Sequence, residues 1–236
     1  MNDIIDKIRN QLKENIDIKT QENSQRFFKE KIEFYGVKVP VVNRISKDYF
    51  KKIEAFDKSE IFKLIEILWQ SSILEESFIA CNWTYSLRKS FHPTDFTIFK
   101  KWIDLYVNNW ASCDTFCNHS LGEFIQMYPE FLVELKIFTN SQNRWMRRAA
   151  AVSLIIPARK GLFLDAIFEI ANILMTDKDD LVQKGYGWML KAASEAHQQE
   201  VYDFVMKKKS IMSRTSLRYA IEKMPKEMRE QVMKKD

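Results

Sequence analysis

The chain has 236 residues, of which 46% are hydrophobic, so it is long enough to bury one sizeable core, and we expect a single domain over residues 1–236. Its 5 Gly and 5 Pro are too few for the many tight turns of a sheet protein and favour long helices joined by short polar turns. The formal net charge of +5 permits a polyanionic partner without requiring one.

The termini and the cysteines bear on the compartment. Residues 1–19 have the pattern of a charged amphipathic helix rather than of a secretory signal, and no apolar run in the sequence is as long as a membrane span. The 3 Cys are an odd number, which cannot all pair within the chain and suits reduced thiols. We therefore expect a cytoplasmic protein with no membrane partner.

Helical periodicity dominates from the N-terminus onward. Residues 61–69 are apolar almost throughout, which predicts a helix buried on most sides. Pro40 and Pro93 are each expected to start a helix, the second with Thr94 or Asp95 as its cap, and Pro129 to interrupt one. The later helix boundaries are expected at residues 140–141, which should end one helix and cap the next, at 177–180 and at 212–213.

Three of the later helices resemble one another. They begin at Asn143, Asp180 and Ser213, 37 and 33 residues apart, and each has a polar cap, basic residues in its first turns and then apolar residues. A segment from Glu75 has a similar layout. A repeat of this length made of helix pairs is typical of a HEAT-like α-solenoid, an all-α fold in which the second helices line a concave face.

Basic residues recur near the starts of these helices, where they are expected to form a basic groove along the concave face. Such a groove suits DNA, since phosphate contacts dominate its affinity. The alternative is that these side chains lie on ordinary solvated helix faces. The candidates for DNA binding are Arg144, Arg147, Arg148, Lys184, Lys191, Arg214 and Arg218.

The segment from Asn108 to Ile125 carries the most chemical information. Trp110 and Asp114 are four residues apart, so on a helix they share one face. A carboxylate beside an aromatic ring can stabilise a cationic transition state. The alternative is structural, with Trp110 in the core and Asp114 acting as a cap.

Other kinds of chemistry have little support in the sequence. Cys113, Cys117 and His119 form a C-x3-C-x-H run, but a fourth zinc ligand and the usual spacing are missing, so we expect packing cysteines and no metal. No companion motif supports a Cys–His nucleophile. The Gly-rich phosphate loop, HExxH and GxSxG are also missing from the sequence.

Two glycines, Gly185 and Gly187, flank Trp188 within a helical pattern. Each costs about 1 kcal/mol relative to Ala inside a helix. Such a cost indicates the close approach of another helix or of a ligand.

Five segments, taken in order, resemble the AlkD-like family of DNA alkylation repair glycosylases over residues 26–222. They are RFFKEKIEFYGVKVPVVNRISKDY, LWQSSILEESFIAC, NNWASCDTFCNHSLGEF, NRWMRRAAAV and DLVQKGYGWMLKAASE. The third is similar to the family's W-x-x-x-D-x(7)-G segment and the fifth to its Q-K-[AG]-x-G-W segment. The sequence departs from the family at residues 178–181, where an aromatic surface is replaced by Lys-Asp-Asp-Leu.

The resemblance implies hydrolysis of the N-glycosidic bond of N3- or N7-alkylated purines in duplex DNA, by a monomer that needs no cofactor. It assigns Asp114 as the catalytic carboxylate, Trp110 and Trp188 as aromatic residues flanking the sugar of the lesion, and Arg148 as the basic residue of the same cleft. Alkylation leaves the base cationic and a good leaving group, which fits a site without a strong general acid. The alternative function is a non-catalytic HEAT-like scaffold that binds DNA or protein; in that case Trp110 and Asp114 should be buried.

Overall fold

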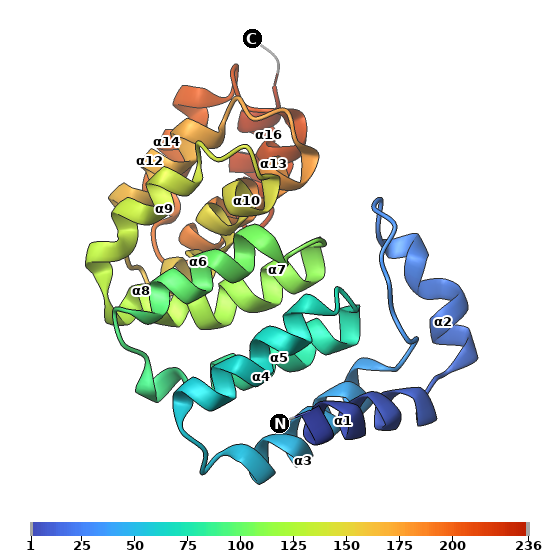
Figure 1. Ribbon diagram of the computed structural model, residues 1–236. Coiled ribbons are helices and arrows are strands. Elements are labelled where there is room, and N and C mark those ends of the chain that lie inside the picture. The colour runs from blue at the N-terminus through green and yellow to red at the C-terminus, as the bar shows by residue number, and fades with distance from the viewer. Residues whose placement is uncertain (1, 235–236) are drawn as a thin grey trace. The chain divides into compact units, whose positions relative to one another are not determined.

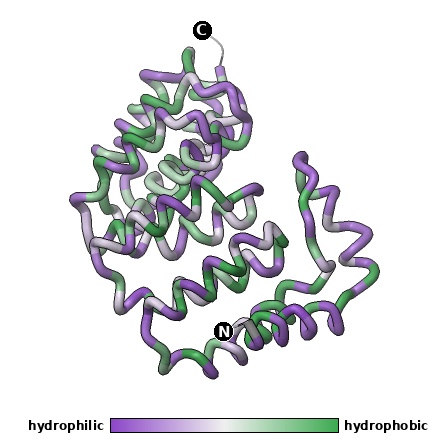
Figure 2. Tube along the Cα trace, in the orientation of Figure 1, coloured by the Kyte–Doolittle hydropathy of each residue, from purple (hydrophilic) through white to green (hydrophobic). Residues whose placement is uncertain are grey.

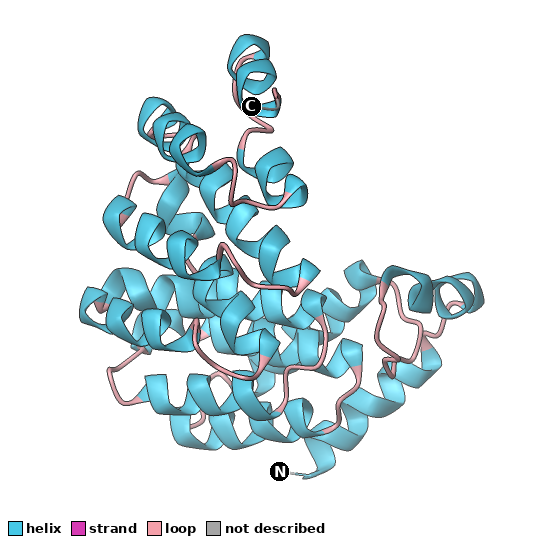
Figure 3. Ribbon diagram, turned by 90° about the horizontal axis from the view of Figure 1, so that it is seen from above, coloured by secondary structure: helices cyan, strands magenta, loops and turns pink. Residues whose placement is uncertain are grey.

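Helices and turns make up the computed structural model, which describes residues 2–234 (Figures 1 and 3). Over this range there is no strand, and an isolated bridge between Glu33 and Ile73 is the one β-type pairing. The expected all-α class is confirmed. None of the helices within 2–234 is both long and apolar enough to cross a membrane.

The chain divides into two compact units, Met1–Phe116 and Cys117–Asp236. Each unit has its own buried apolar core, and in both of them apolar and polar residues alternate along the helices (Figure 2). The expectation of a single domain over residues 1–236 stays a prediction.

The first unit contains seven α-helices and two short 3-10 helices among the described residues. Its helices are α1 (Asn2–Glu14), α2 (Ile18–Ser24), η1 (Gln25–Phe27), α3 (Val39–Ile53), α4 (Lys58–Gln70), α5 (Leu74–Ser86), η2 (Arg88–Ser90), α6 (Asp95–Leu105) and α7 (Trp110–Phe116).

Helix α5 is the centre of this unit, because it packs against α3, α4 and α7. The predicted helix at 61–69 forms most of α4, and most of its apolar side chains are buried. An aromatic cluster joins α4, α6 and the end of α7. The Phe62 and Trp102 rings lie 5.4 Å apart, and the Trp69 and Phe116 rings 5.7 Å apart, both edge to face. This core fixes α7, which carries two of the expected site residues.

The second unit begins at the residue after α7. Its helices are η3, a π-helical segment (Cys117–Leu121), α8 (Gly122–Met127), η4 (Pro129–Phe131), α9 (Leu132–Phe138), α10 (Arg144–Val152), α11 (Ile155–Arg159), α12 (Leu164–Leu174), α13 (Asp180–Ala193), α14 (Gln198–Lys208), α15 (Arg214–Ala220) and α16 (Lys226–Met233).

Helix pairs stack in this unit as they do in HEAT-like repeats. Helix α9 packs on α10 and α12 on α13, while the first helices α9 and α12 also touch each other. The second helices form a row in which α13 lies between α10 and α15. These are the three helices whose similarity the sequence showed.

The helix starts agree with the sequence at most positions. Pro40 lies in the first turn of α3, and η4 begins at Pro129. Thr94 is the N-cap residue of α6 without a side-chain bond, whereas the carboxylate of Asp95 accepts from the backbone N–H of His92 at 2.8 Å. One expectation was wrong: Ser141 does not cap α10. Asn143 does, because its side chain is two residues from the Trp145 N–H that it accepts, at 2.9 Å.

Candidate functional site

Trp110 and Asp114 lie on α7 in the first unit, four residues apart as expected. The helix starts there because the side chain of Asn109 accepts a hydrogen bond from the Ser112 N–H at 2.9 Å. Trp110 is half-buried, and Asp114 is 9% exposed. A catalytic pair was expected to be open and a structural pair buried. The structure gives an intermediate result, with a partly accessible ring and a mostly enclosed carboxylate.

The ring of Trp110 has a neighbour that the sequence did not indicate. Phe28 stacks on it with ring centroids 5.5 Å apart and an interplanar angle of 26°. The Trp110 indole Nε1–H also donates to the carbonyl oxygen of Phe27 at 3.1 Å. These two contacts fix the orientation of the indole, because one restrains its face and the other its edge. More than 80 residues separate the partners, so no local pattern reveals the pairing.

Two buried glutamates at the start of α5 hold the segment that carries Phe28. Both oxygens of Glu75 accept from backbone N–H groups, of Tyr35 at 3.0 Å, Gly36 at 2.8 Å and Val37 at 2.9 Å. Gly36 has a φ of +91°, a conformation that favours glycine, and this bends the three N–H groups toward one carboxylate.

Glu76 is fully buried and is neutralised by a second set of contacts. Its carboxylate accepts from the Arg9 guanidinium, with the Nη2 bond at 3.1 Å, and from the Tyr35 hydroxyl at 2.7 Å. Burial and the hydrogen bond to Glu76 raise the pKa of Tyr35 above its usual range. Helix α1, residues 33–37 and α5 are thereby tied together.

Arg148 and Trp188 lie in the second unit, on α10 and α13 respectively. Arg148 is 5% exposed, and its guanidinium donates to the carbonyl oxygen of Leu181 in the first turn of α13. Its side chain also lies beside Gly185. Trp188 is half-buried. Arg148 is therefore held rigidly between two neighbouring helices.

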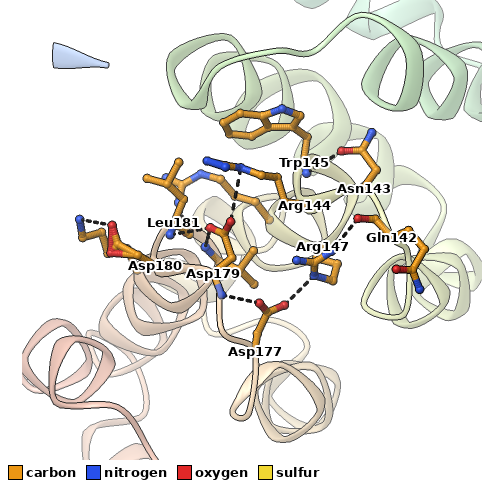
Figure 4. A network of polar contacts seen from close by, with 12 residues as sticks. Gln142, Asn143, Arg144, Trp145, Arg147, Asp177, Asp179, Asp180 and Leu181 are labelled. Atoms are coloured by element: carbon orange, nitrogen blue, oxygen red, sulfur yellow. Dashed lines mark hydrogen bonds and ion pairs between the residues drawn. The ribbon is translucent and has the colours of Figure 1, made fainter. Parts of the chain in front are cut away.

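Acidic residues of the loop between α12 and α13 neutralise the other basic residues of α10 (Figure 4). Arg147 donates through Nε to Asp177 at 2.6 Å and through Nη1 to the carbonyl oxygens of Ser141 and Gln142. Arg144 pairs with Asp179 at 3.4 Å.

The basic residues of α13 and α15 have mixed surroundings. Lys184 pairs with Asp180 at 3.1 Å, and Lys191 pairs with Glu222 at 3.0 Å. Arg214 and Arg218 are exposed, and Arg214 donates to the carbonyl oxygen of Met233. Much of the expected basic groove in this unit is thus matched by acidic side chains.

The three cysteines, Cys81, Cys113 and Cys117, are buried free thiols. Burial raises the pKa of the Cys81 thiol, which disfavours a reactive thiolate. His119 is exposed. The part of the chain that the structure describes contains no group of three or more His, Cys, Asp or Glu side chains that could hold a metal ion.

The sequence matches the family described as DNA alkylation repair enzyme over residues 8–224. The chain belongs to this family. No curated protein matches. Among solved structures, one described as a predicted DNA alkylation repair enzyme from Enterococcus faecalis superimposes with a TM-score of 0.80 at 21% identity, covering 90% of this chain and 98% of the other. The likeness shows that the two chains share a fold.

Close packing of helices explains why Gly122 and Gly187, both in segments that resemble the DNA alkylation repair family, have no side chain. A Cβ on Gly122 would lie 2.7 Å from the carbonyl oxygen of Ser153, and one on Gly187 would lie 2.8 Å from the Cβ of Tyr219. Gly185 is different, since its nearest neighbours would be 3.6 Å away, an ordinary contact. Of the two alternatives for the glycines beside Trp188, the approach of another helix accounts for Gly187.

The turn at residues 177–180, where the sequence departs from the aromatic pattern expected for the family, also has a structural role. Residues 177–180 provide the N-cap of α13, since Asp179 accepts from the Leu181 N–H at 2.9 Å. The same acidic turn binds the arginines of α10. The loop therefore joins one repeat to the next by ionic contacts.

Proposed function

We propose that the chain is a DNA glycosylase that hydrolyses the N-glycosidic bond of N3- and N7-alkylated purines, such as 7-methylguanine and 3-methyladenine, in duplex DNA. The observation that carries this proposal is the pair of Trp110 and Asp114 on α7 of a chain from the DNA alkylation repair family. The carboxylate is mostly withdrawn from water, where its field on a nearby cation is least screened.

In the proposed reaction the bond between C1′ of the deoxyribose and the base nitrogen breaks first. The bonding electrons leave with the base, which becomes neutral because it was cationic. Positive charge develops on the sugar, and Asp114 stabilises it. Water then attacks C1′ and gives its proton to Asp114, which acts as general base. The products are the free base and an abasic site.

The other assigned residues have supporting roles in this proposal. Trp110 and Trp188 pack against the sugar and contribute cation–π stabilisation. Arg148 contacts a backbone phosphate and thereby sets the register of the strand. The Leu181 carbonyl supports this role, since it fixes the direction of the guanidinium before DNA binds. We infer a monomer that works without a cofactor.

A non-catalytic scaffold that binds DNA or protein is the second candidate. It is favoured by the low exposure of Asp114, 9%, and by the contacts that tie Trp110 to Phe27 and Phe28. In that case the pair would serve to hold the N-terminal segment on α7.

The deciding experiment is release of 7-methylguanine from a methylated duplex under single-turnover conditions, with the same unmethylated duplex as control. A glycosylase liberates the base and leaves an abasic site that alkali cleaves. Binding of both duplexes without base release would refute the glycosylase and support the scaffold.

A further inference from the structure

A groove lined by polar side chains and by the rings of Phe50 and Tyr85 lies between α3 and α5 in the first unit, and no expectation from the sequence included it. Its volume is about 460 Å³. Positions 43, 47 and 51 of α3 are four residues apart and form one stripe, which faces a second stripe at positions 82 and 86 of α5. The side chains used here are Asn43, Lys47, Lys51, Asn82 and Ser86, with Glu54 at the end of the groove.

The two lysines in this groove carry charge that no ion pair among the described residues neutralises. Lys47 and Lys51 are exposed, and neither has an ion pair within residues 2–234. Like charges at this spacing on a helix repel each other by a few tenths of a kcal/mol. A bound anion would relieve that repulsion.

Three basic residues of the second unit that were expected to bind DNA show the opposite arrangement. There Arg147, Lys184 and Lys191 each contact a carboxylate. A groove at the C-terminal end, lined by Arg218, Lys226 and Arg229, also contains Glu222 and Glu230. The charged side chains that line the two grooves sum to the same net charge, so the difference lies in pairing. In the C-terminal groove Lys226 pairs with Glu230 at 3.8 Å, whereas Lys47 and Lys51 have no ion pair among the described residues, and a polyanion is therefore better matched by the groove between α3 and α5.

The groove also offers hydrogen-bond donors. The Asn82 side-chain amide donates to Asn43 Oδ1 at 3.0 Å, which orients the Asn43 amide and leaves its NH₂ group for another acceptor. Lysine ammonium and amide NH₂ groups are common ligands of phosphate oxygens, and none of these contacts reads the base sequence.

We propose that this groove binds the phosphodiester backbone of duplex DNA, with Lys47 and Lys51 each contacting a phosphate. The proposal rests on the proposed function for its partner and names residues outside the assigned set. Binding here would hold DNA through sequence-independent contacts, as a repair enzyme that must inspect any sequence requires.

The test is the salt dependence of DNA binding by the full chain. Fluorescence anisotropy of a labelled unmethylated duplex gives the association constant at several NaCl concentrations, for wild type, Lys47→Gln, Lys51→Gln and the double variant. The slope of log K against log salt is negative, and each lost phosphate contact should reduce its magnitude by about 0.9. The control is Lys63→Gln, an exposed lysine of α4 outside the groove, which should keep the wild-type slope.

The proposal that this groove binds DNA would be wrong if the variants had the same slope as the wild type, or if Lys63→Gln changed the slope equally. It would also be wrong if the wild type did not bind DNA. A slope change seen with an RNA duplex and not with DNA would overturn the assignment to DNA. Base release separates the two proposals. If the variants reduce the slope but the wild type releases no 7-methylguanine, the groove binds DNA and the glycosylase proposal is wrong. If the wild type releases the base but the slopes do not change, the glycosylase proposal stands and the groove does not bind DNA.

Discussion

Phe28 and Trp110 are stacked, with ring centroids 5.5 Å apart, although they are far apart in the sequence. The stack covers one face of the indole ring and leaves the other face for contact with the deoxyribose of the proposed substrate. Because Phe27 also holds the indole N–H, the N-terminal segment sets the direction in which Trp110 points. The segment is thus a structural partner of the candidate active site.

Two substitutions of Phe28 should distinguish the stability that comes from its burial from the stability that comes from its stacking on Trp110. Phe28 is half-buried, so Phe28→Ala should lower the free energy of unfolding by about 2 kcal/mol, roughly half the cost for a fully buried Phe. Phe28→Leu keeps most of the apolar volume and should lose only the ring contact, about 0.5–1.5 kcal/mol. Urea denaturation of both variants measures the difference. Equal stability of Phe28→Ala and wild type would mean that the stack is not formed in solution.

Glu75→Gln should destabilise the chain by about 1–3 kcal/mol, the cost of unsatisfied buried polar groups. The carboxylate accepts three backbone N–H bonds, whereas a glutamine places an NH₂ group against at least one of those donors. The measurement is chemical denaturation, with the exposed Glu22→Gln as the matched control. A variant within about 0.5 kcal/mol of wild type would show that water satisfies these N–H groups.

The sequence predicted the parts of this structure that local patterns encode. The N-cap at Ser213 and the spacing of α10, α13 and α15 follow from side chains within a few residues of each helix start, whereas the cap of α10 was expected at residues 140–141 and lies at Asn143. The helical segment from Glu75 was expected from the sequence, but the three backbone N–H groups that its carboxylate accepts from were not. The contacts that shape Trp110, and the carboxylates that neutralise Arg144 and Arg147, depend on residues brought together by tertiary packing, which a local pattern does not specify.

Gly187 and Gly185 should respond in opposite ways to alanine. In Gly187→Ala the new Cβ would lie 2.8 Å from the Tyr219 Cβ and 2.9 Å from the Ser216 carbonyl oxygen, so α13 and α15 must move apart, at about 1–3 kcal/mol. In Gly185→Ala the contacts are ordinary, and the helix gains up to about 1 kcal/mol of propensity. Thermal and urea unfolding of the two variants provide the comparison. The packing argument fails if Gly187→Ala is the more stable of the two.

Asp17 should make stability depend on pH at the acid end. Its ion pair with Lys38 and then its hydrogen bonds from Thr20 lower its pKa from 3.8 to about 2. Because the pKa of Asp17 is lower in the folded than in the unfolded chain, its contacts stabilise the folded state at pH values above the pKa of the unfolded chain. That contribution is lost as the pH falls from about 4 to about 2. The stability difference between wild type and Asp17→Asn should therefore shrink over this window. A constant difference from pH 5 to pH 2 would contradict the ion pair.

The proposed chemistry depends most on Asp114. Asp114→Asn preserves size and shape but removes the charge that opposes the cation developing on the sugar, and loss of one such oriented group commonly costs about 10²–10³ in rate. DNA binding should persist, because a carboxylate repels phosphates. Trp110→Ala and Trp188→Ala should each cost less, since one cation–π contact is worth roughly 0.5–2 kcal/mol. Arg148→Ala should weaken both binding and rate.

Single-turnover release of 7-methylguanine measures these rates, with a binding titration and a thermal melt for every variant. Asp203→Asn is the matched control, because Asp203 is exposed on α14 and lies outside the assigned residues. The melt is needed because Asp114 is mostly enclosed, so a slow variant must be shown to be folded. A folded Asp114→Asn that releases base at the wild-type rate would remove Asp114 from the mechanism, even if the wild type is a glycosylase.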